Sequence, residues 1–198
     1  MRIIDCEQGT KEWLMARLGI PTASGFDKIV TLKAEKSKQR DKYLYKLVGE
    51  KIINTPSESY TNDIMQRGKD LESEARLAYE FITGNEVKQV GFCISDDGKY
   101  GCSPDGLIGD DGLLEIKCPS LAVHVEYLLK NTLPSDYFQQ VQGQLLVTGR
   151  KWVDFMSYYP GIRPLITRVY PDKAFLSLFA RELGLLCDEL ERVYKILK

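Results

Sequence analysis

Leu113-Leu114-Glu115-Ile116-Lys117-Cys118 is the stretch that decides the fold, because it reads as one strand with two different faces. Side chains alternate across a strand, so Glu115 and Lys117 project from the same face. Ile116 projects from the opposite face, which predicts that it enters the core. The strand therefore presents an acid and an amine side by side while its other face packs against apolar residues.

The turn before this strand predicts a carboxylate partner for Glu115. Gly109-Asp110-Asp111-Gly112 has the residues of a tight antiparallel connection. It folds the strand back onto an expected strand at 100–108, which contains Asp105. We therefore expect Asp105 to lie across from Glu115, so that two carboxylates and the Lys117 ammonium share a small surface.

This grouping suits hydrolysis of a phosphodiester. Two adjacent carboxylates raise each other's pKa unless a cation lies between them. Mg²⁺ takes oxygen ligands and keeps several waters, so Asp105, Glu115 and the backbone carbonyl of Ile116 suffice to hold an ion. A remaining water would be the nucleophile, which Lys117 would orient or help to deprotonate while it offsets phosphate charge.

Each of these residues also has a simpler interpretation. Asp105 is a common turn residue, and Glu115 with Lys117 could form a solvated strand face, because short motifs have many false positives. Glu72, on a helix upstream, could be a further acidic ligand for one or two metal ions. It could equally form a surface ion pair with Arg76, which lies four residues further along that helix.

The rest of the chain alternates helical and strand patterns without an internal repeat. Helices are expected at 10–18, 25–30, 44–52, 62–82, 121–129, 135–147 and from 173 onward. Strands are expected at 87–95, 100–108, 113–118, 153–159 and 165–170. This order predicts an α/β or α+β fold in three layers, in which a central mixed sheet is flanked by helices. We expect one domain over residues 1–198.

Composition limits the class of protein. The 198 residues are 43% hydrophobic and 28% charged, which is typical of a globular chain. No apolar run approaches the ~18 residues of a membrane span, and the start MRIIDCEQGT lacks a signal peptide's apolar core, so we expect a cytoplasmic protein. The five cysteines form no CxxC pair, which favours buried reduced thiols over a disulfide framework or a zinc site.

Charge is balanced overall but concentrated in one segment. The net charge is −1, which excludes a basic field over the whole molecule. Residues 33–46 carry six basic side chains against two acidic ones, a local net charge of +4. Such a run is usually a solvated helix face. Beside a nuclease site it would also be a candidate for salt-dependent, sequence-independent contacts to duplex DNA.

Five motifs in chain order resemble those of the PD-(D/E)xK nucleases, and more closely those of the phage lambda exonuclease and YqaJ-type viral recombinase family. They are Trp13…Ala16-Arg17-Leu18-Gly19 with Thr22-Ala23-Ser24, Gly68-Lys69…Glu72 with Ala75-Arg76, Cys102-Ser103-Pro104-Asp105-Gly106, Leu114-Glu115-Ile116-Lys117-Cys118-Pro119, and Gln140-Val141-Gln142. One such motif could arise by chance, whereas five in register are specific. Residues 33–62 and those from 160 onward resemble the family only in type.

The resemblance implies a restriction-endonuclease-like core and a set of roles. Asp105 and Glu115 would hold one or two Mg²⁺ ions, for which Mn²⁺ can substitute, with Glu72 assisting and Lys117 serving the attacking water. The positions that bind a 5′-terminal phosphate in the family correspond here to Arg17, Ser24, Ser103 and Gln140. Arginine supplies a planar fork of donors for phosphate, and hydroxyl and amide groups complete such a pocket. Met65 corresponds to an apolar wedge that splits the terminal base pair, although a core methionine is simpler.

The family resemblance also implies an activity. It implies a 5′-to-3′ exonuclease that digests one strand of double-stranded DNA to 5′-mononucleotides and leaves 3′ overhangs for recombination. A homotrimeric ring around DNA and a single-strand annealing protein as partner are implied too. The alternatives are an endonuclease on the same fold and a non-catalytic module that binds DNA ends.

Two absences in the sequence narrow the chemistry further. His124 is the only histidine and has no partner pattern, so we expect it to be neither ligand nor base. This disfavours nucleases that depend on histidine and triad enzymes. No G-x-x-x-x-G-K-[ST] loop occurs, so ATP is not expected to drive movement along DNA.

Overall fold

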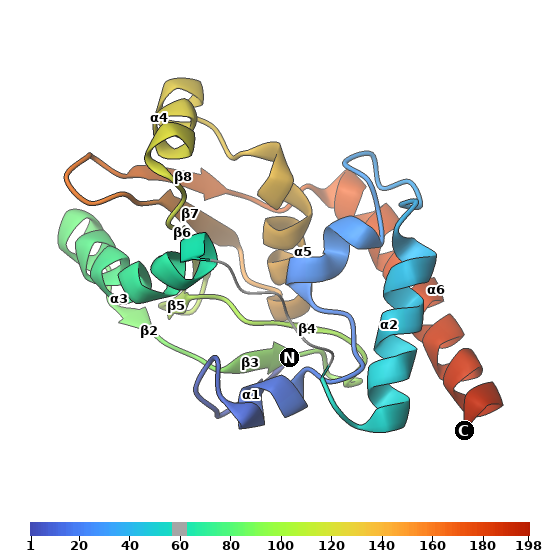
Figure 1. Ribbon diagram of the computed structural model, residues 1–198. Helices are drawn as coiled ribbons and strands as arrows, with labels where there is room; N and C mark the ends of the chain where they lie inside the picture. The colour runs from blue at the N-terminus through green and yellow to red at the C-terminus, as the bar shows by residue number, and fades with distance from the viewer. Residues whose placement is uncertain (57–62) are drawn as a thin grey trace.

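The computed structural model describes residues 1–56 and 63–198, except for the side chains of residues 63–65 and 69 (Figure 1). The α-helices are α1 (Lys11–Ala16), α2 (Arg40–Ile53), α3 (Asp63–Thr83), α4 (Leu121–Lys130), α5 (Phe138–Thr148) and α6 (Lys173–Leu197), with 3₁₀ turns η1 (Ala23–Lys28) and η2 (Ser135–Tyr137). The strands are β1 (Arg2–Ile4), β2 (Val87–Lys88), β3 (Phe92–Ile94), β4 (Gly101–Cys102), β5 (Gly106–Ile108), β6 (Gly112–Lys117), β7 (Trp152–Ser157) and β8 (Leu165–Val169).

The centre of the fold is a five-stranded mixed sheet in the order β2-β5-β6-β7-β8. Strands β6 and β7 run parallel, and the other neighbouring pairs run antiparallel. Strand β6, which contains Glu115 and Lys117, therefore lies in the middle of the sheet, and the expected hairpin turn joins it to β5. The predicted α/β fold with a central mixed sheet flanked by helices is confirmed.

Two expected strands, at 87–95 and 100–108, are each divided, and the prediction of continuous strands was wrong there. Their first and last parts join different sheets, because β3 and β4 pair with each other and with β1 in a separate three-stranded sheet. Pro104 lies in the second break, where a residue without a backbone N–H cannot continue a ladder. Gly91 lies in the first, where a Cβ atom would come within 2.1 Å of the Cys6 carbonyl oxygen.

One helix covers each face of the central sheet. Ala75 and Tyr79 of α3 pack against the face that carries Leu114 and Ile116, so Ile116 enters the core as expected. Helix α5 covers the opposite face, where its apolar residues meet Leu113 and its neighbours on β5 and β7. Because Glu115 and Lys117 share the face of Leu113, they point toward α5 rather than toward α3.

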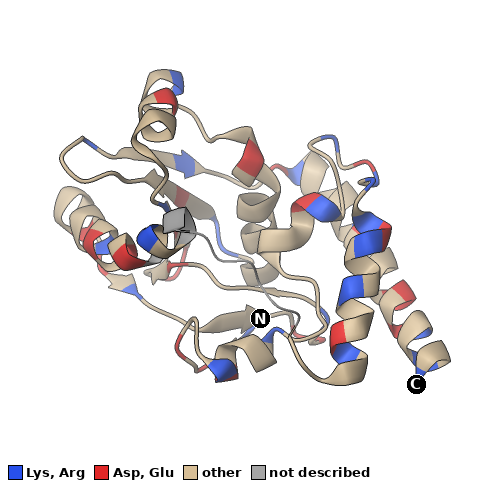
Figure 2. Cartoon of the chain, in the orientation of Figure 1, with Lys and Arg blue, Asp and Glu red and all other residues tan. Residues whose placement is uncertain are grey.

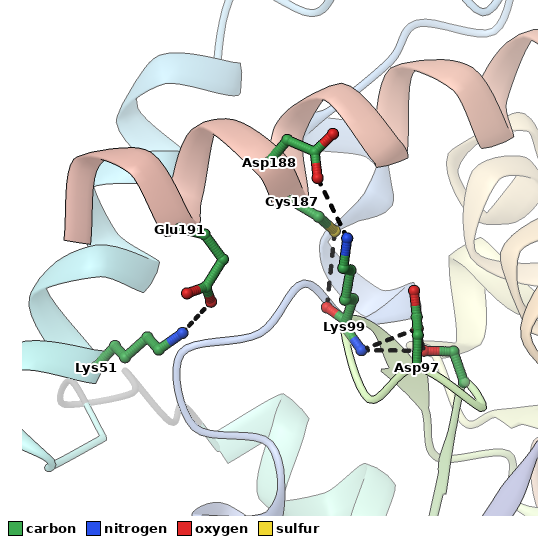
Figure 3. Close-up of polar contacts among 7 residues, drawn as sticks. Lys51, Asp97, Lys99, Cys187, Asp188 and Glu191 are labelled. Carbon is green, nitrogen blue, oxygen red and sulfur yellow. Dashed lines mark hydrogen bonds and ion pairs between the residues drawn. The ribbon is translucent and has the colours of Figure 1, made fainter. Parts of the chain in front are cut away.

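Helices α2 and α6 form a further layer beyond α5, and together with η1 they enclose a second apolar core. Polar contacts attach α6 to its surroundings (Figure 3). Lys51 of α2 pairs with Glu191, and Lys99 in the β3–β4 turn pairs with Asp188 at 3.2 Å. The Cys187 thiol donates to the Lys99 carbonyl oxygen at 3.7 Å, so the long helix is anchored at both the helical layer and the small sheet.

The basic segment at 33–46 is only partly available to a ligand. Arg40 is buried, and it pairs with Glu189 at 2.7 Å, 149 residues away. Lys36 and Lys46 also have acidic partners within 4 Å. Figure 2 shows acidic and basic residues interspersed along α2 and α6. Three lysines of the segment are exposed and lie away from these pairs: Lys33, Lys38 and Lys42.

Most of the cysteines lie in the core. All five are free, and four of them are buried, whereas Cys6 is half-buried. In the described part of the chain, no helix combines the length and apolar character that a membrane crossing requires.

Candidate active site

Asp105 and β6 form the centre of the site. The backbone N–H of Asp105 donates to the Leu114 carbonyl oxygen at 3.0 Å, which continues the β5–β6 pairing by one step. The Asp105 carboxylate in turn accepts the backbone N–H of Ile116 at 2.5 Å. These two bonds place Asp105 beside Glu115, as the hairpin turn predicts.

The Glu115 carboxylate is buried and receives three donors. Only 1% of the residue is exposed. One oxygen, Oε1, accepts from Lys117 Nζ and from Gln140 Nε2, each at 2.5 Å. The other oxygen, Oε2, accepts from Gln144 Nε2. Both oxygens are therefore held, by the neighbouring strand residue and by two glutamines of α5.

Burial and mutual charge control the ionisation of the site. Burial, followed by the charge of Glu115, holds the pKa of the Asp105 carboxyl well above its usual range. Burial alone would lower the pKa of Lys117, but the charges of Glu115 and Asp105 outweigh it and raise that pKa. The amine is therefore an ammonium at neutral pH, which makes it a hydrogen-bond donor.

A second group of residues places Arg17 opposite this cluster. The guanidinium lies 3.9 Å from the centre of the Trp13 ring, and its Nη2 atom donates to Thr22 Oγ1 and Ser24 Oγ at 3.3 and 3.2 Å. Trp13 Nε1 donates to Ser103 Oγ at 2.8 Å. Arg17 and Ser24 thus line one wall together with Ser103, which is distant from them in sequence.

Local sequence explains why this wall forms. Thr10 caps α1 by accepting the Trp13 N–H, which begins the helix that carries Arg17 at its end. Tyr43 of α2 accepts the Thr22 N–H at 3.2 Å. Gly25 is required beside it, because a Cβ atom there would lie 2.6 Å from the Tyr43 oxygen. The segment after α1 is thereby fixed as a 3₁₀ turn, tighter than the expected helix at 25–30.

These two groups share one small polar cavity of about 130 Å³. Its walls contain Arg17, Ser24, Ser103, Asp105, Glu115, Lys117 and Gln140, together with Trp13, Thr22 and Gln144. Seven of the ten predicted site residues therefore line one cavity. Gln140 lies against Glu115, so its amide contacts the acidic cluster as well as facing the arginine wall.

Of the three other predicted residues, two are described, Glu72 and the backbone of Ile116, and both lie next to Asp105. Glu72 pairs with Arg76 at 2.5 Å, and Arg76 Nε also donates to the Asp105 carbonyl oxygen at 3.3 Å. Both line an adjoining cavity of about 530 Å³, to which Asp105 also belongs. Ile116 contributes its backbone N–H to Asp105, and its carbonyl as a ligand stays a prediction. The side chain of Met65 lies outside the described residues, so its role as a wedge also stays a prediction.

The donor set fits a hard divalent cation. Within the described part of the chain, no group of three or more histidine, cysteine and acidic side chains has the spacing of a metal site. Asp105 and Glu115 nevertheless supply two adjacent carboxylates, and burial, followed by the charge of Glu115, raises the pKa of Asp105. Oxygen donors and uncompensated negative charge are what Mg²⁺ and Mn²⁺ require.

Sequence reasoning missed Gln144, and it expected His124 to be neither ligand nor base. Gln144 lies four residues after Gln140 and so shares its helix face, which is the signal that could have identified it. His124 is buried, and its ring nitrogens contact Ser157 Oγ at 2.8 Å and the Arg163 carbonyl oxygen at 3.1 Å. It lines neither of the two cavities.

Comparisons with known proteins bear on this arrangement. A family model described as the YqaJ-like viral recombinase domain matches residues 12–151, which include every predicted site residue. A comparison with the curated proteins finds no match.

Solved structures show a similar fold. The alkaline exonuclease LHK-Exo from Laribacter hongkongensis is 35% identical, with a TM-score of 0.86 over 95% of this chain and 96% of that chain. LHK-Exo in complex with dAMP is 36% identical, with a TM-score of 0.86 over 96% of each chain. A phage-related exonuclease from Haemophilus somnus 129PT has a TM-score of 0.69 over 90% of this chain and 96% of its own; at 12% identity it shows the fold alone.

Proposed function

The chain belongs to the family of YqaJ-like viral recombinase domains, which confirms the resemblance read from its motifs, and on that premise we propose that it is a metal-dependent exonuclease. It digests one strand of double-stranded DNA in the 5′-to-3′ direction, releases 5′-mononucleotides and leaves 3′ overhangs for recombination. Its similarity to an alkaline exonuclease over nearly the whole chain supports the reaction class.

One observation carries the proposal. Two carboxylates and an ammonium from the β5–β6 hairpin face an arginine and two serines across a single cavity of about 130 Å³. A cavity of this size has room for a phosphate group. Anionic and cationic walls facing each other suit a phosphodiester that is held by one wall and hydrolysed at the other.

The acidic residues and Lys117 line one wall of the cavity and act on the metal ion and the water. Asp105 and Glu115 hold one or two divalent cations, with Glu72 and the Ile116 carbonyl as further candidates. A divalent cation supplies Lewis-acid polarisation of the phosphodiester and activation of the attacking water. Lys117, beside Glu115, orients that water or favours its deprotonation, and it offsets phosphate charge.

The pocket around Arg17 supports the proposed 5′-to-3′ direction of digestion. Arg17 presents a guanidinium that is already oriented by Thr22 and Ser24, and such a planar fork matches phosphate oxygens. Ser103 and Gln140 complete the pocket for a 5′-terminal phosphate. A deoxynucleoside monophosphate, dAMP, is the ligand in one LHK-Exo structure, which supports a mononucleotide product.

The proposal includes the oligomer and the protein partner that the family resemblance implies. The chain forms a homotrimeric ring that encloses duplex DNA, and a single-strand annealing protein receives the overhang. Sedimentation equilibrium tests the first statement, since a trimer has three times the mass of the 22.6 kDa chain.

The activity is tested with a blunt duplex labelled at either 5′ end, with and without Mg²⁺. We expect Mg²⁺-dependent release of labelled mononucleotides by the wild type, and a loss of at least about 100-fold in Glu115→Ala and Lys117→Ala. Equal digestion by both variants, once folding is verified, would contradict the proposal. Cleavage of a covalently closed circle would instead identify an endonuclease, and binding to ends without any release of nucleotides would identify a non-catalytic module.

A further inference from the structure

Helix α5 contains three buried glutamines, and one of them differs from the others in how its amide is used. Gln139, Gln142 and Gln144 are 6%, 1% and 0% exposed. Burying an amide costs free energy unless both its ends find hydrogen-bond partners. The hydrogen-bond partners of each amide therefore indicate the role of that glutamine.

Gln142 is a structural residue of the helical layer. Its Nε2 atom donates to the Tyr170 carbonyl oxygen at 2.9 Å, and its Oε1 atom accepts the Asp172 N–H at 2.8 Å. Both ends of the amide are satisfied by the backbone that leads into α6. Gln142 thus stabilises the connection between β8 and α6, and it lines neither of the two cavities of the site.

Gln144 has the opposite pattern. Its Nε2 atom donates to Glu115 Oε2, whereas its Oε1 atom is fully buried and has no hydrogen-bond partner among the described residues. The residue lines the small cavity. Gln142 satisfies both ends of its amide, and Gln139 donates to the Val30 carbonyl oxygen at 3.3 Å; among the described residues of α5, neither of them leaves a fully buried amide oxygen without a partner. The bond to Glu115 is therefore what the buried amide contributes.

The three donors to Glu115 are not equivalent. Lys117 and Gln140 share Oε1, and both side chains are partly exposed, so they can exchange partners when phosphate enters. Gln144 is the donor to Oε2, and its side chain is fully buried where the other two are partly exposed.

We propose that Gln144 is a positioning residue, which fixes the plane of the Glu115 carboxylate so that a divalent cation meets a preset oxygen ligand. The inference rests on the proposed function, because it assumes that Glu115 binds a cation. Groups that orient metal ligands commonly change metal affinity by ~10–100-fold when they are removed. The same loss is expected here, without any loss of affinity for the DNA end.

The test is isothermal titration of the metal-free full chain with Mn²⁺, in the wild type, Gln144→Met and the matched control Gln142→Met. Both variants replace a buried glutamine of α5 by an apolar side chain of similar length, so both are expected to lower the melting temperature. Only Gln144→Met should weaken Mn²⁺ binding, by ~10–100-fold. The Mg²⁺ concentration that gives half-maximal digestion should rise by the same factor, with the KM for duplex ends unchanged.

The outcomes separate the inference from the proposed function. If the folded wild type and Gln144→Met bind Mn²⁺ equally, or if Gln142→Met weakens binding as much, the positioning role is overturned while the nuclease assignment stands. If the folded wild type binds no Mn²⁺, both fail. Should Gln144→Met not fold, Gln144→Asn keeps the amide but retracts it by one methylene, and unchanged affinity in that variant overturns the inference.

Discussion

The Asp105 carboxylate accepts the backbone N–H of Ile116 at 2.5 Å, across the hairpin that joins β5 to β6. The bond fixes an acidic side chain to the backbone next to a second acid, Glu115. It holds the two charges together although burial and mutual repulsion raise the pKa of Asp105. Without a cation, the site therefore stores unfavourable electrostatic energy, as sites that bind metals commonly do.

Asp105→Asn should separate stability from activity. The amide oxygen can still accept the Ile116 N–H, while one negative charge leaves the cluster. The free energy of unfolding in EDTA should stay unchanged or rise, because burial and the charge of Glu115 raise the pKa of Asp105 and so disfavour its ionised form in the fold. Digestion of duplex DNA should fall by at least about 100-fold.

Urea denaturation and an end-labelled duplex measure the two effects. Asp97→Asn is the control, because the hydrogen bond from Ser95 lowers the pKa of Asp97, so removal of its charge should not stabilise the fold. A loss of more than about 1 kcal/mol in Asp105→Asn would contradict stored repulsion at the site.

Arg17→Lys tests the phosphate pocket. A lysine keeps the charge but cannot donate to two hydroxyls and stack on Trp13 as the guanidinium does. The ratio of kcat/KM for 5′-phosphorylated over 5′-hydroxyl ends should fall by about 10-fold, since charge-assisted bidentate bonds contribute about 1.5–3 kcal/mol. Arg181→Lys, on the exposed surface of α6, should leave the ratio unchanged. An unaltered preference in Arg17→Lys would place the terminal phosphate elsewhere.

Residues of the basic segment should divide into two classes. Lys38→Ala, at an exposed position, should weaken binding of a 30-base-pair duplex in Ca²⁺ and reduce the salt slope by about 1. Arg40→Ala should leave the slope unchanged and lower the free energy of unfolding by about 1–3 kcal/mol, because it removes a buried stem and the pair with Glu189. Titrations at several salt concentrations, with urea denaturation, measure both. The opposite assignment of effects would show that the buried arginine contacts DNA.

Tyr43→Phe should alter the alkaline stability of the fold. Burial raises the pKa of Tyr43 from 10.0 to about 12. Its neutral form therefore stabilises the fold below pH 10, and that contribution declines as the pH rises from 10 to 12, where the unfolded chain ionises first. At pH 7 the free energy of unfolding of the variant should be lower by about 1 kcal/mol, because the hydrogen bond from the Thr22 N–H is lost.

Above pH 10 the variant should lose stability more slowly than the wild type, by up to about 1.4 kcal/mol per pH unit. Urea denaturation at pH 7 to 11.5 measures this difference. Tyr45→Phe is the control, because Tyr45 is exposed on the same helix. Parallel curves for Tyr43→Phe and the wild type above pH 10 would refute the assignment.

Sequence patterns predicted most of the helices and strands, because side-chain alternation, turns and helix ends depend on neighbouring residues. Alternation along β6 placed Glu115 and Lys117 on one face and Ile116 in the core, and the glycine-rich turn returned the chain to Asp105. Asn54 and Gly149 end α2 and α5 in left-handed conformations, near the residues where the patterns predict termination. Each of these outcomes depends on a few consecutive residues.

Contacts over long distances in sequence were beyond such patterns. The strand at 87–95 breaks where Gly91 admits the segment around Cys6, a partner that is not visible in the strand itself. Pro104 is a local signal for the break in 100–108, but which sheet each half joins depends on distant strands. Likewise, the sequence of the basic segment at 33–46 does not distinguish Arg40 from the exposed lysines. Only the fold brings Glu189 of α6 to Arg40.

By itself, the sequence determined the family, the mixed fold and the acid–amine strand, since motif order and side-chain alternation are written along the chain. Only the tertiary structure decided which amide holds which carboxylate oxygen, that Glu72 turns to Arg76, and that Arg17 faces the acidic cluster. The physical reason is that a buried charge takes its partners from whatever elements pack around it. For Glu115 those partners come from a helix 25 and 29 residues further along the chain.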